Sequence, residues 1–253
     1  MTTFDLPHST AAPSRLGVPG HSNDRLALYR RVFREAAIVC PADVLARTGM
    51  AAAVRTHGHG VEVRSLDQLA VATSLGIPAS RIVLQDDGTT AAPIRRGVDA
   101  GVGRIVLACS EQVKVLASCA MRRQRIMLDV KADAVDAVLA CTRLELVGLH
   151  ARLAPAAGVP DYVDVVAEMV AHMAWIRRRH RLITTRVSLG GGRLLSDTAE
   201  PSELRDFDAA LEDAFDDACA RFRFPRPALI LTPWCDGRPV PISARGEELW
   251  HVP

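Results

Sequence analysis

The stretch best suited to chemistry is the end of the run RVSLGGG, where a β-branched apolar segment leads into Gly190, Gly191 and Gly192. Because glycine has no Cβ, an anion can come close to several backbone N–H groups, and phosphate cradles are built in this way. A glycine run also ends a strand simply to turn a corner. The sequence therefore predicts a phosphate cradle here, with the corner turn as the alternative.

Two further residue types could move protons or form covalent bonds. His150 stands in an otherwise apolar run, where a histidine is either a general acid–base or a hydrogen-bonded core residue. Lys131 and Lys114 are the chain's two lysines, and only a primary amine can form an imine with an aldehyde. Lys131 follows an apolar run and is either a reactive amine or a solvated loop lysine. Lys114, in the middle of a helical pattern, is interpreted as a surface residue.

Other polar groups have simpler interpretations. Asp86, Asp87 and Asp129 could form a paired-carboxylate site, although the sequence DDGT at 86–89 also suits a turn and helix cap. His57 and His59 resemble a metal pair, but no third ligand accompanies them. No metal site is predicted.

Eight short apolar runs rich in Val, Ile and Leu alternate with amphipathic segments along the chain. Continuous rather than alternating runs are typical of parallel strands that are covered on both faces. The predicted strands are 36–42, 60–65, 81–85, 104–108, 125–130, 146–153, 186–191 and 227–234.

The segments between these runs predict helices. Ser65 and Gln68 form a capping box, and Gly76 marks the end of that helix. Apolar residues at three- and four-residue spacing predict long helices over 161–180 and after Ser202. Strands alternating with helices over this length predict an α/β fold, a (β/α)8 TIM-type barrel, with a doubly wound sheet as the alternative.

In such a barrel, ligands bind at the carboxyl ends of the strands. That rule selects the polar residues and glycines that directly follow the predicted strands. They are Asp43, Arg64, Gln85, Asp86, Asp87, Cys109, Ser110, Asp129, Lys131, His150, Arg152, Gly190 to Arg193 and Thr232 to Arg238.

The composition limits the class of protein. With 31 basic and 29 acidic residues among 253, the net charge is +2, which indicates neither nucleic-acid nor membrane binding. Six scattered cysteines without a C-x-x-C pair indicate reduced thiols, and neither Cys40 nor Cys109 has an evident histidine base. We expect residues 1–24 to be a disordered arm, residues 25–253 to be one barrel domain, and the protein to be cytoplasmic.

Taken in order, five segments resemble the alanine-racemase-like barrel of the fold type III pyridoxal-phosphate enzymes, most closely the diaminopimelate and ornithine decarboxylases. The segments are GHGVEVRSLDQLAVATSLGIPASRIVL, GVDAGVGRIVLACSEQVKVL, LELVGLH, VSLGGG and PALILTPWCDGRPV. The resemblance implies pyridoxal phosphate as cofactor, a phosphate cup made by Gly190 to Gly192 and extended by Gly237 and Arg238, and a second, β-rich domain after the barrel. The chain ends at Pro253, before such a domain.

The resemblance also shows departures where the family's chemistry resides. The aldimine lysine's place, counted without gaps from GHGVEV, is Asp43, which cannot form a Schiff base. His150 is kept, but Arg152 replaces the histidine that stacks on the pyridine ring and Pro155 replaces a phosphate-binding serine. Thr232 replaces the glutamate that keeps the pyridine nitrogen protonated.

Three hypotheses follow. The first is a degenerate decarboxylase-like barrel without normal decarboxylase activity, acting as a phospholigand-binding or regulatory paralogue. The second is an active decarboxylase or racemase-like enzyme of amino acids in which Lys131 or a partner chain supplies the amine. The third is a structural partner that docks onto a two-domain homologue. A homodimer is compatible with the first two.

Overall fold

The chain folds into a closed barrel of parallel strands. The computed structural model describes residues 21–86, 90–195 and 199–233. Each strand pairs with its neighbour in sequence, and β1 pairs with β8 to close the cylinder. The strands are β1 (Ala37–Pro41), β2 (Gly60–Val63), β3 (Ile82–Gln85), β4 (Arg104–Leu107), β5 (Gln124–Asp129), β6 (Leu144–Leu153), β7 (Arg186–Gly191) and β8 (Ala228–Thr232).

All the predicted strands are present, and the predicted (β/α)8 barrel is confirmed. β6 begins at Leu144, two residues before its predicted start, and β2 ends at Val63, two residues before its predicted end. The pairing of β5 with β6 shifts register between Ile126 and Met127, so the longer strand accommodates an irregularity.

Two apolar layers explain why the strand runs are continuous. Val39, Val83, Val106, Met127 and Ile230 form a small cluster that fills the barrel interior. The alternate residues of the same strands belong to the larger cluster under the helices. Because both faces of every strand are buried, an alternating polar pattern would be unstable here.

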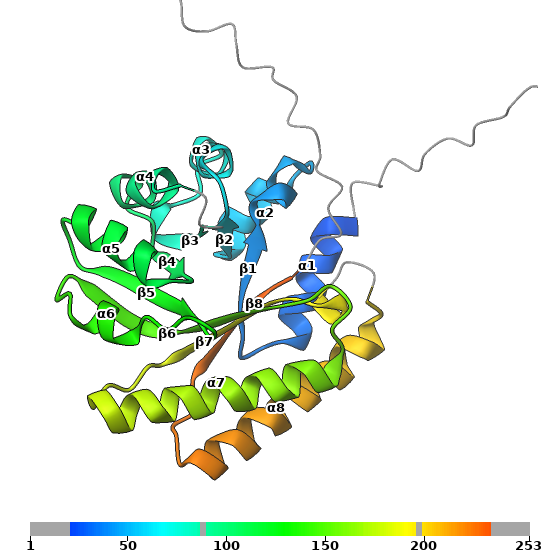
Figure 1. The fold of residues 1–253 in the computed structure, drawn as a ribbon. Helices are drawn as coiled ribbons and strands as arrows, with labels where there is room; N and C mark the ends of the chain where they lie inside the picture. Colours follow the sequence, from blue (N-terminus) through cyan, green and yellow to red (C-terminus); the bar gives the residue numbers. More distant parts are fainter. Residues whose placement is uncertain (1–20, 87–89, 196–198, 234–253) are drawn as a thin grey trace, which may run out of the picture.

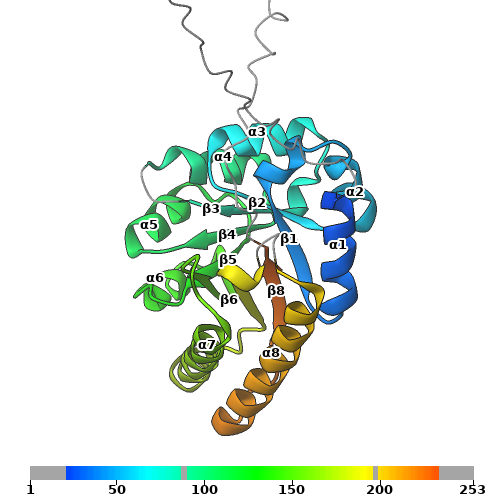
Figure 2. The same ribbon diagram turned by 90° about the vertical axis from the view of Figure 1, so that its right-hand side faces the viewer.

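Helices surround the barrel (Figure 1). The two longest, α7 and α8, lie side by side on its outer surface, as both views show (Figures 1 and 2). The helices are α1 (His21–Val32), α2 (Met50–His57), α3 (Leu66–Ser74), α4 (Ala92–Ala100), α5 (Ser110–Cys119), α6 (Val135–Leu139), α7 (Val159–His180) and α8 (Pro201–Phe222), with short 3-10 turns η1 (Ala42–Ala46), η2 (Ala79–Arg81) and η3 (Arg193–Leu195).

Local signals set several helix ends. The Ser65 side chain accepts a hydrogen bond from the Gln68 N–H at 3.2 Å, as predicted, whereas the Gln68 side chain accepts from the Arg64 N–H instead of the Ser65 N–H. The long helix predicted over 161–180 is α7, which starts two residues earlier. Most of the predicted arm and the turn at 87–89 lie outside the described residues, and α1 begins at His21.

Candidate functional site

Strand register brings four predicted site residues together at the carboxyl mouth of the barrel. Arg152 on β6 is the register partner of Gly190 on β7, and Gly190 is the partner of Thr232 on β8. His150 stands two residues before Arg152 on the same strand face, and its partner is Ser188. The mouth therefore joins a glycine turn, a histidine and an arginine on three adjacent strands.

The glycine turn has a backbone that only glycine adopts easily. Gly191 and Gly192 have φ values of 76° and 71°, in the left-handed region. A Cβ on Gly191 would stand 2.3 Å from the Leu153 carbonyl oxygen, and one on Gly192 would stand 2.2 Å from the Tyr162 hydroxyl. The buried Tyr162 hydroxyl donates a hydrogen bond of 2.5 Å to the Gly191 carbonyl. The turn is thus held in place from α7.

Gly190 differs from its two neighbours. A Cβ at this position would meet Thr232 Cβ at 3.5 Å and His150 Cε1 at 3.9 Å, which are ordinary van der Waals distances. Thr232 is only 2% exposed. Space next to Gly190 is therefore bounded by the His150 ring and the Thr232 side chain.

His150 is a buried neutral base. Its Nδ1 lies 3.1 Å from the Ser188 hydroxyl, whereas its Nε2 is buried without a hydrogen-bond partner among the described residues. Burial, followed by the charges of Arg152 and Arg64, lowers the pKa of His150 to about 3. A buried ring nitrogen without a hydrogen bond costs free energy. Nε2 would therefore gain from a hydrogen bond with a group that enters the mouth.

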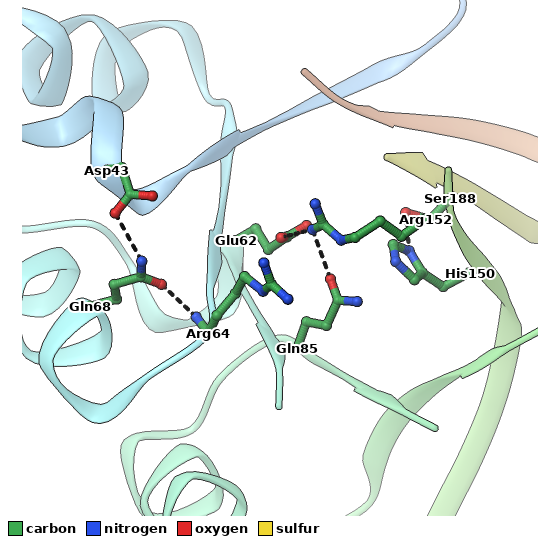
Figure 3. A network of polar contacts seen from close by, with 8 residues as sticks. All are labelled: Asp43, Glu62, Arg64, Gln68, Gln85, His150, Arg152 and Ser188. Atoms are coloured by element: carbon green, nitrogen blue, oxygen red, sulfur yellow. Dashed lines mark hydrogen bonds and ion pairs between the residues drawn. The ribbon is translucent and has the colours of Figure 1, made fainter. Parts of the chain in front are cut away.

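Arg152 crosses the mouth from β6 to the opposite strands (Figure 3). Its Nη2 forms an ion pair with Glu62 on β2 and donates a hydrogen bond of 3.0 Å to Gln85 on β3. The Glu62 side chain is 5% exposed and that of Arg152 is 20% exposed. In Figure 3 the Arg64 side chain also turns toward this pair, so two guanidinium groups face the mouth.

The end of β1 carries no amine. Val39 belongs to the inner cluster, so Pro41, two residues later, faces inward, and its register partner is Glu62. Asp43 follows in η1 with an exposed side chain, and its Oδ1 accepts a hydrogen bond of 2.9 Å from Gln68 Nε2. Figure 3 shows Asp43 apart from His150 and Arg152, directed at Gln68.

The two lysines lie elsewhere. Lys131 is exposed in the turn after β5, where its backbone N–H donates to Asp129 Oδ1 at 3.0 Å. Lys114 on α5 is exposed and stands 4.0 Å from Glu111. Gly237 and Arg238, which were expected to extend the phosphate cup, lie outside the described residues.

Of the remaining sequence candidates, Asp129 ends β5 at the same mouth as the register partner of His150. Asp86 is buried, and Asp87 lies outside the described residues, so the paired-carboxylate interpretation stays a prediction. Within the described ranges, no three His, Cys, Asp or Glu residues gather as a metal site would require. None of the described helices has the length and apolar character needed to cross a membrane.

Sequence reasoning missed Glu62, Ser188 and Tyr162. Glu62 is the informative case, because a carboxylate inside the buried run GVEV needs a partner, and its strand face is shared with Arg64. The run did not reveal that the partner is Arg152, 90 residues away. Tyr162 lies in the helix predicted over 161–180, and no sequence pattern indicates that its hydroxyl contacts Gly191.

Known proteins resemble this chain in sequence and fold. Residues 20–141 match the family "Pyridoxal-dependent decarboxylase, pyridoxal binding domain". A diaminopimelate decarboxylase from Actinosynnema pretiosum subsp. auranticum is 25% identical over 281 residues, covering 96% of this chain and 63% of that protein.

Solved structures share the fold. Diaminopimelate decarboxylase from M. jannaschi has a TM-score of 0.70 at 13% identity, over 83% of this chain and 58% of that one. Lysine/ornithine decarboxylase from Vibrio vulnificus, complexed with putrescine, has a TM-score of 0.71 at 12% identity, over 85% and 61%. The chain spans about three fifths of the length of these relatives. In its ordered motifs, its closed barrel and these matches, the chain resembles the barrel of the fold type III pyridoxal-phosphate decarboxylases.

Proposed function

We propose that this barrel binds a phosphate-bearing ligand non-covalently at its carboxyl mouth and does not carry out the amino-acid decarboxylation of its relatives. The proposal rests on the residues at the end of the first strand, β1. Its last inward residue is Pro41, and the sequence predicts Asp43 at the place of the family's aldimine lysine. Neither can form an imine with an aldehyde.

The mouth suits the phosphate of the family's cofactor. Gly190 to Gly192 form a turn without side chains, and Thr232 borders it. The buried His150 Nε2 offers one more polar atom beside the turn. Two guanidinium groups, from Arg152 and Arg64, favour an anion at this mouth.

The same mouth does not suit covalent attachment. The space opposite Pro41 is used by the Glu62–Arg152 ion pair, and a guanidinium stays protonated and is not a nucleophile at neutral pH. Lys131 is exposed after β5. Pyridoxal phosphate, when covalently bound, supplies an electron sink for carbanions, and Thr232 lacks the negative charge that would keep its ring nitrogen protonated.

The experiment compares pyridoxal phosphate with pyridoxal, which lacks the phosphate, by calorimetric titration. We expect reversible binding of pyridoxal phosphate and much weaker binding of pyridoxal. Gly190→Val should fill the cradle and weaken binding at least about tenfold, because the added methyl groups occupy the anion's approach. Gly158→Ala is the matched control, since its Cβ meets other atoms only at 3.8 Å and beyond.

Equal binding of pyridoxal and pyridoxal phosphate, or an unchanged affinity in Gly190→Val, would remove the phosphate cradle from the proposal. Sustained carbon dioxide release from a panel of basic and dicarboxylic amino acids would remove the claim of lost activity.

The rival proposal is an active decarboxylase or racemase-like enzyme that uses Lys131 or an amine from a partner chain. The family match over residues 20–141 and the location of Lys131 after a strand end favour it. It predicts turnover that disappears in Lys131→Met, or turnover that appears only when a two-domain homologue is added. If no turnover is seen with the protein by itself or with the two-domain homologue added, the rival proposal is excluded and the first proposal stands.

A further inference from the structure

A second polar depression lies at the opposite, amino-terminal end of the barrel. It has a volume of about 460 Å³ and opens where β1, β2, β3 and β4 begin. Among the described residues, its wall carries basic side chains and no acidic ones. The basic and imidazole groups that line it are Arg30, Arg34, His57, His59, Arg81 and Arg104.

His59 is the buried polar group of this depression. It is 6% exposed, and its Nε2 has no hydrogen-bond partner among the described residues. Burial, and then the charge of Arg30, lowers the pKa of His59 to about 4, with a backbone hydrogen bond to Ile38 opposing the change. His59 therefore presents an unused ring nitrogen to a space surrounded by positive charge.

A metal ion does not suit this space. His57 Nδ1 lies 3.0 Å from Arg30 Nη1, and because a guanidinium only donates, that nitrogen is already used as an acceptor. The surrounding arginines would repel a cation. The His57–His59 pair, which looks like a metal motif in the sequence, is better suited to an anion.

Three arginines converge on the same end of the barrel from inside. Arg104 is the register partner of the inward Val83, and Arg125 and Arg186 share strand faces with Met127 and Ser188. Burial and the charges of Arg186 and Arg125 lower the pKa of Arg104, which still remains protonated.

Within the described part of the chain, none of Arg104, Arg125 and Arg186 forms an ion pair. The neighbouring Glu145 stands 3.5 Å from Arg123 and does not line the depression. Like charges held together without a counter-charge favour the uptake of an anion.

We propose that this depression binds a small phosphate-bearing ligand, held by Arg104 with Arg34 and Arg81, with the His59 ring in the wall beside it. Its volume is that of a small-molecule site, and guanidinium groups match phosphate oxygens in geometry as well as charge. The site lies at the opposite mouth from Gly190, so it is separate from the cradle described above.

The test uses inorganic pyrophosphate as the probe and the histidine ring resonances of the protein as the readout. The His59 signals are assigned from the spectrum of His59→Asn, which lacks them. We expect saturable shifts of the His59 signals in the wild-type protein. Arg104→Gln should weaken this binding at least about tenfold, and Arg34→Gln, an exposed position, about threefold or more.

Two controls separate this site from the other mouth. Arg205→Gln removes an exposed charge near the start of α8 and should leave the affinity unchanged. Gly190→Val should also leave the His59 shifts unchanged. Unshifted His59 signals in the wild type would overturn the proposal, and so would equal affinity in Arg34→Gln, which does not depend on whether Arg104→Gln folds.

Discussion

Replacing Arg152 by methionine should destabilise the fold by leaving a buried carboxylate without its counter-charge. Glu62 is 5% exposed in its side chain, and Arg152 is its ion-pair partner. Removal of one member of a buried pair costs about 3 to 5 kcal/mol, and we expect the lower end, about 3 kcal/mol, because the Arg152 side chain is 20% exposed. Glu62→Gln combined with Arg152→Met should cost less than the sum of the two single changes, with a coupling of about 1 to 3 kcal/mol.

Urea denaturation followed by circular dichroism measures each free energy of unfolding. Arg64→Met is the matched control, because Arg64 is an exposed arginine at the same mouth, and it should change the free energy by no more than about 0.5 kcal/mol. Equal costs for Arg152→Met and Arg64→Met would refute the reasoning. So would strict additivity in the double variant, since the two side chains would then not interact.

Three further predictions concern the mouth and its support. Gly192→Ala should lower stability by at least about 2 kcal/mol in thermal denaturation, because φ is 71° and the new Cβ meets Tyr162, whereas Gly190→Ala should be nearly neutral. Burial lowers the pKa of His150 to about 3 from its ordinary value of 6.5. Between these two pH values His150 binds a proton in the unfolded chain but not in the folded protein. The free energy of unfolding therefore decreases as the pH falls from 6.5 toward 3. Between about pH 7 and pH 5 this loss is about 2 kcal/mol, and denaturation curves of His150→Gln should lack it; parallel pH profiles for the two proteins would show that His150 titrates normally. Ser65→Ala should cost about 1 kcal/mol through loss of the cap at α3, and a value near zero in urea denaturation would mean that Gln68 alone holds this end.

The strands were predictable because each is buried on both faces, and a strand buried in this way has a continuous run of apolar residues. The α3 cap was predictable for a similarly local reason, because Ser65 and its bonding partner are three residues apart. The order of strands around the barrel follows from short, regular connections.

The arrangement inside the mouth depends on register, which local patterns do not contain. Glu62 and Arg152 are 90 residues apart, and only the closed cylinder brings them together. Counting without gaps selected Asp43 as the place of the missing amine, whereas the inward residue opposite Glu62 is Pro41, because β1 ends before η1 begins. The burial of His59 could not be predicted for the same reason, because it depends on α1, β1 and η2 around the ring.

The proposal that the cofactor is not bound covalently is tested most directly by borohydride reduction. The purified protein is mixed with pyridoxal phosphate, reduced, digested and mapped by mass spectrometry, with Lys131→Met treated in parallel. Our account predicts unmodified Lys131 and Lys114 peptides and a cofactor that dialysis removes before reduction. A stoichiometric pyridoxyl group on Lys131, absent from the variant and accompanied by an imine absorption band before reduction, would contradict it.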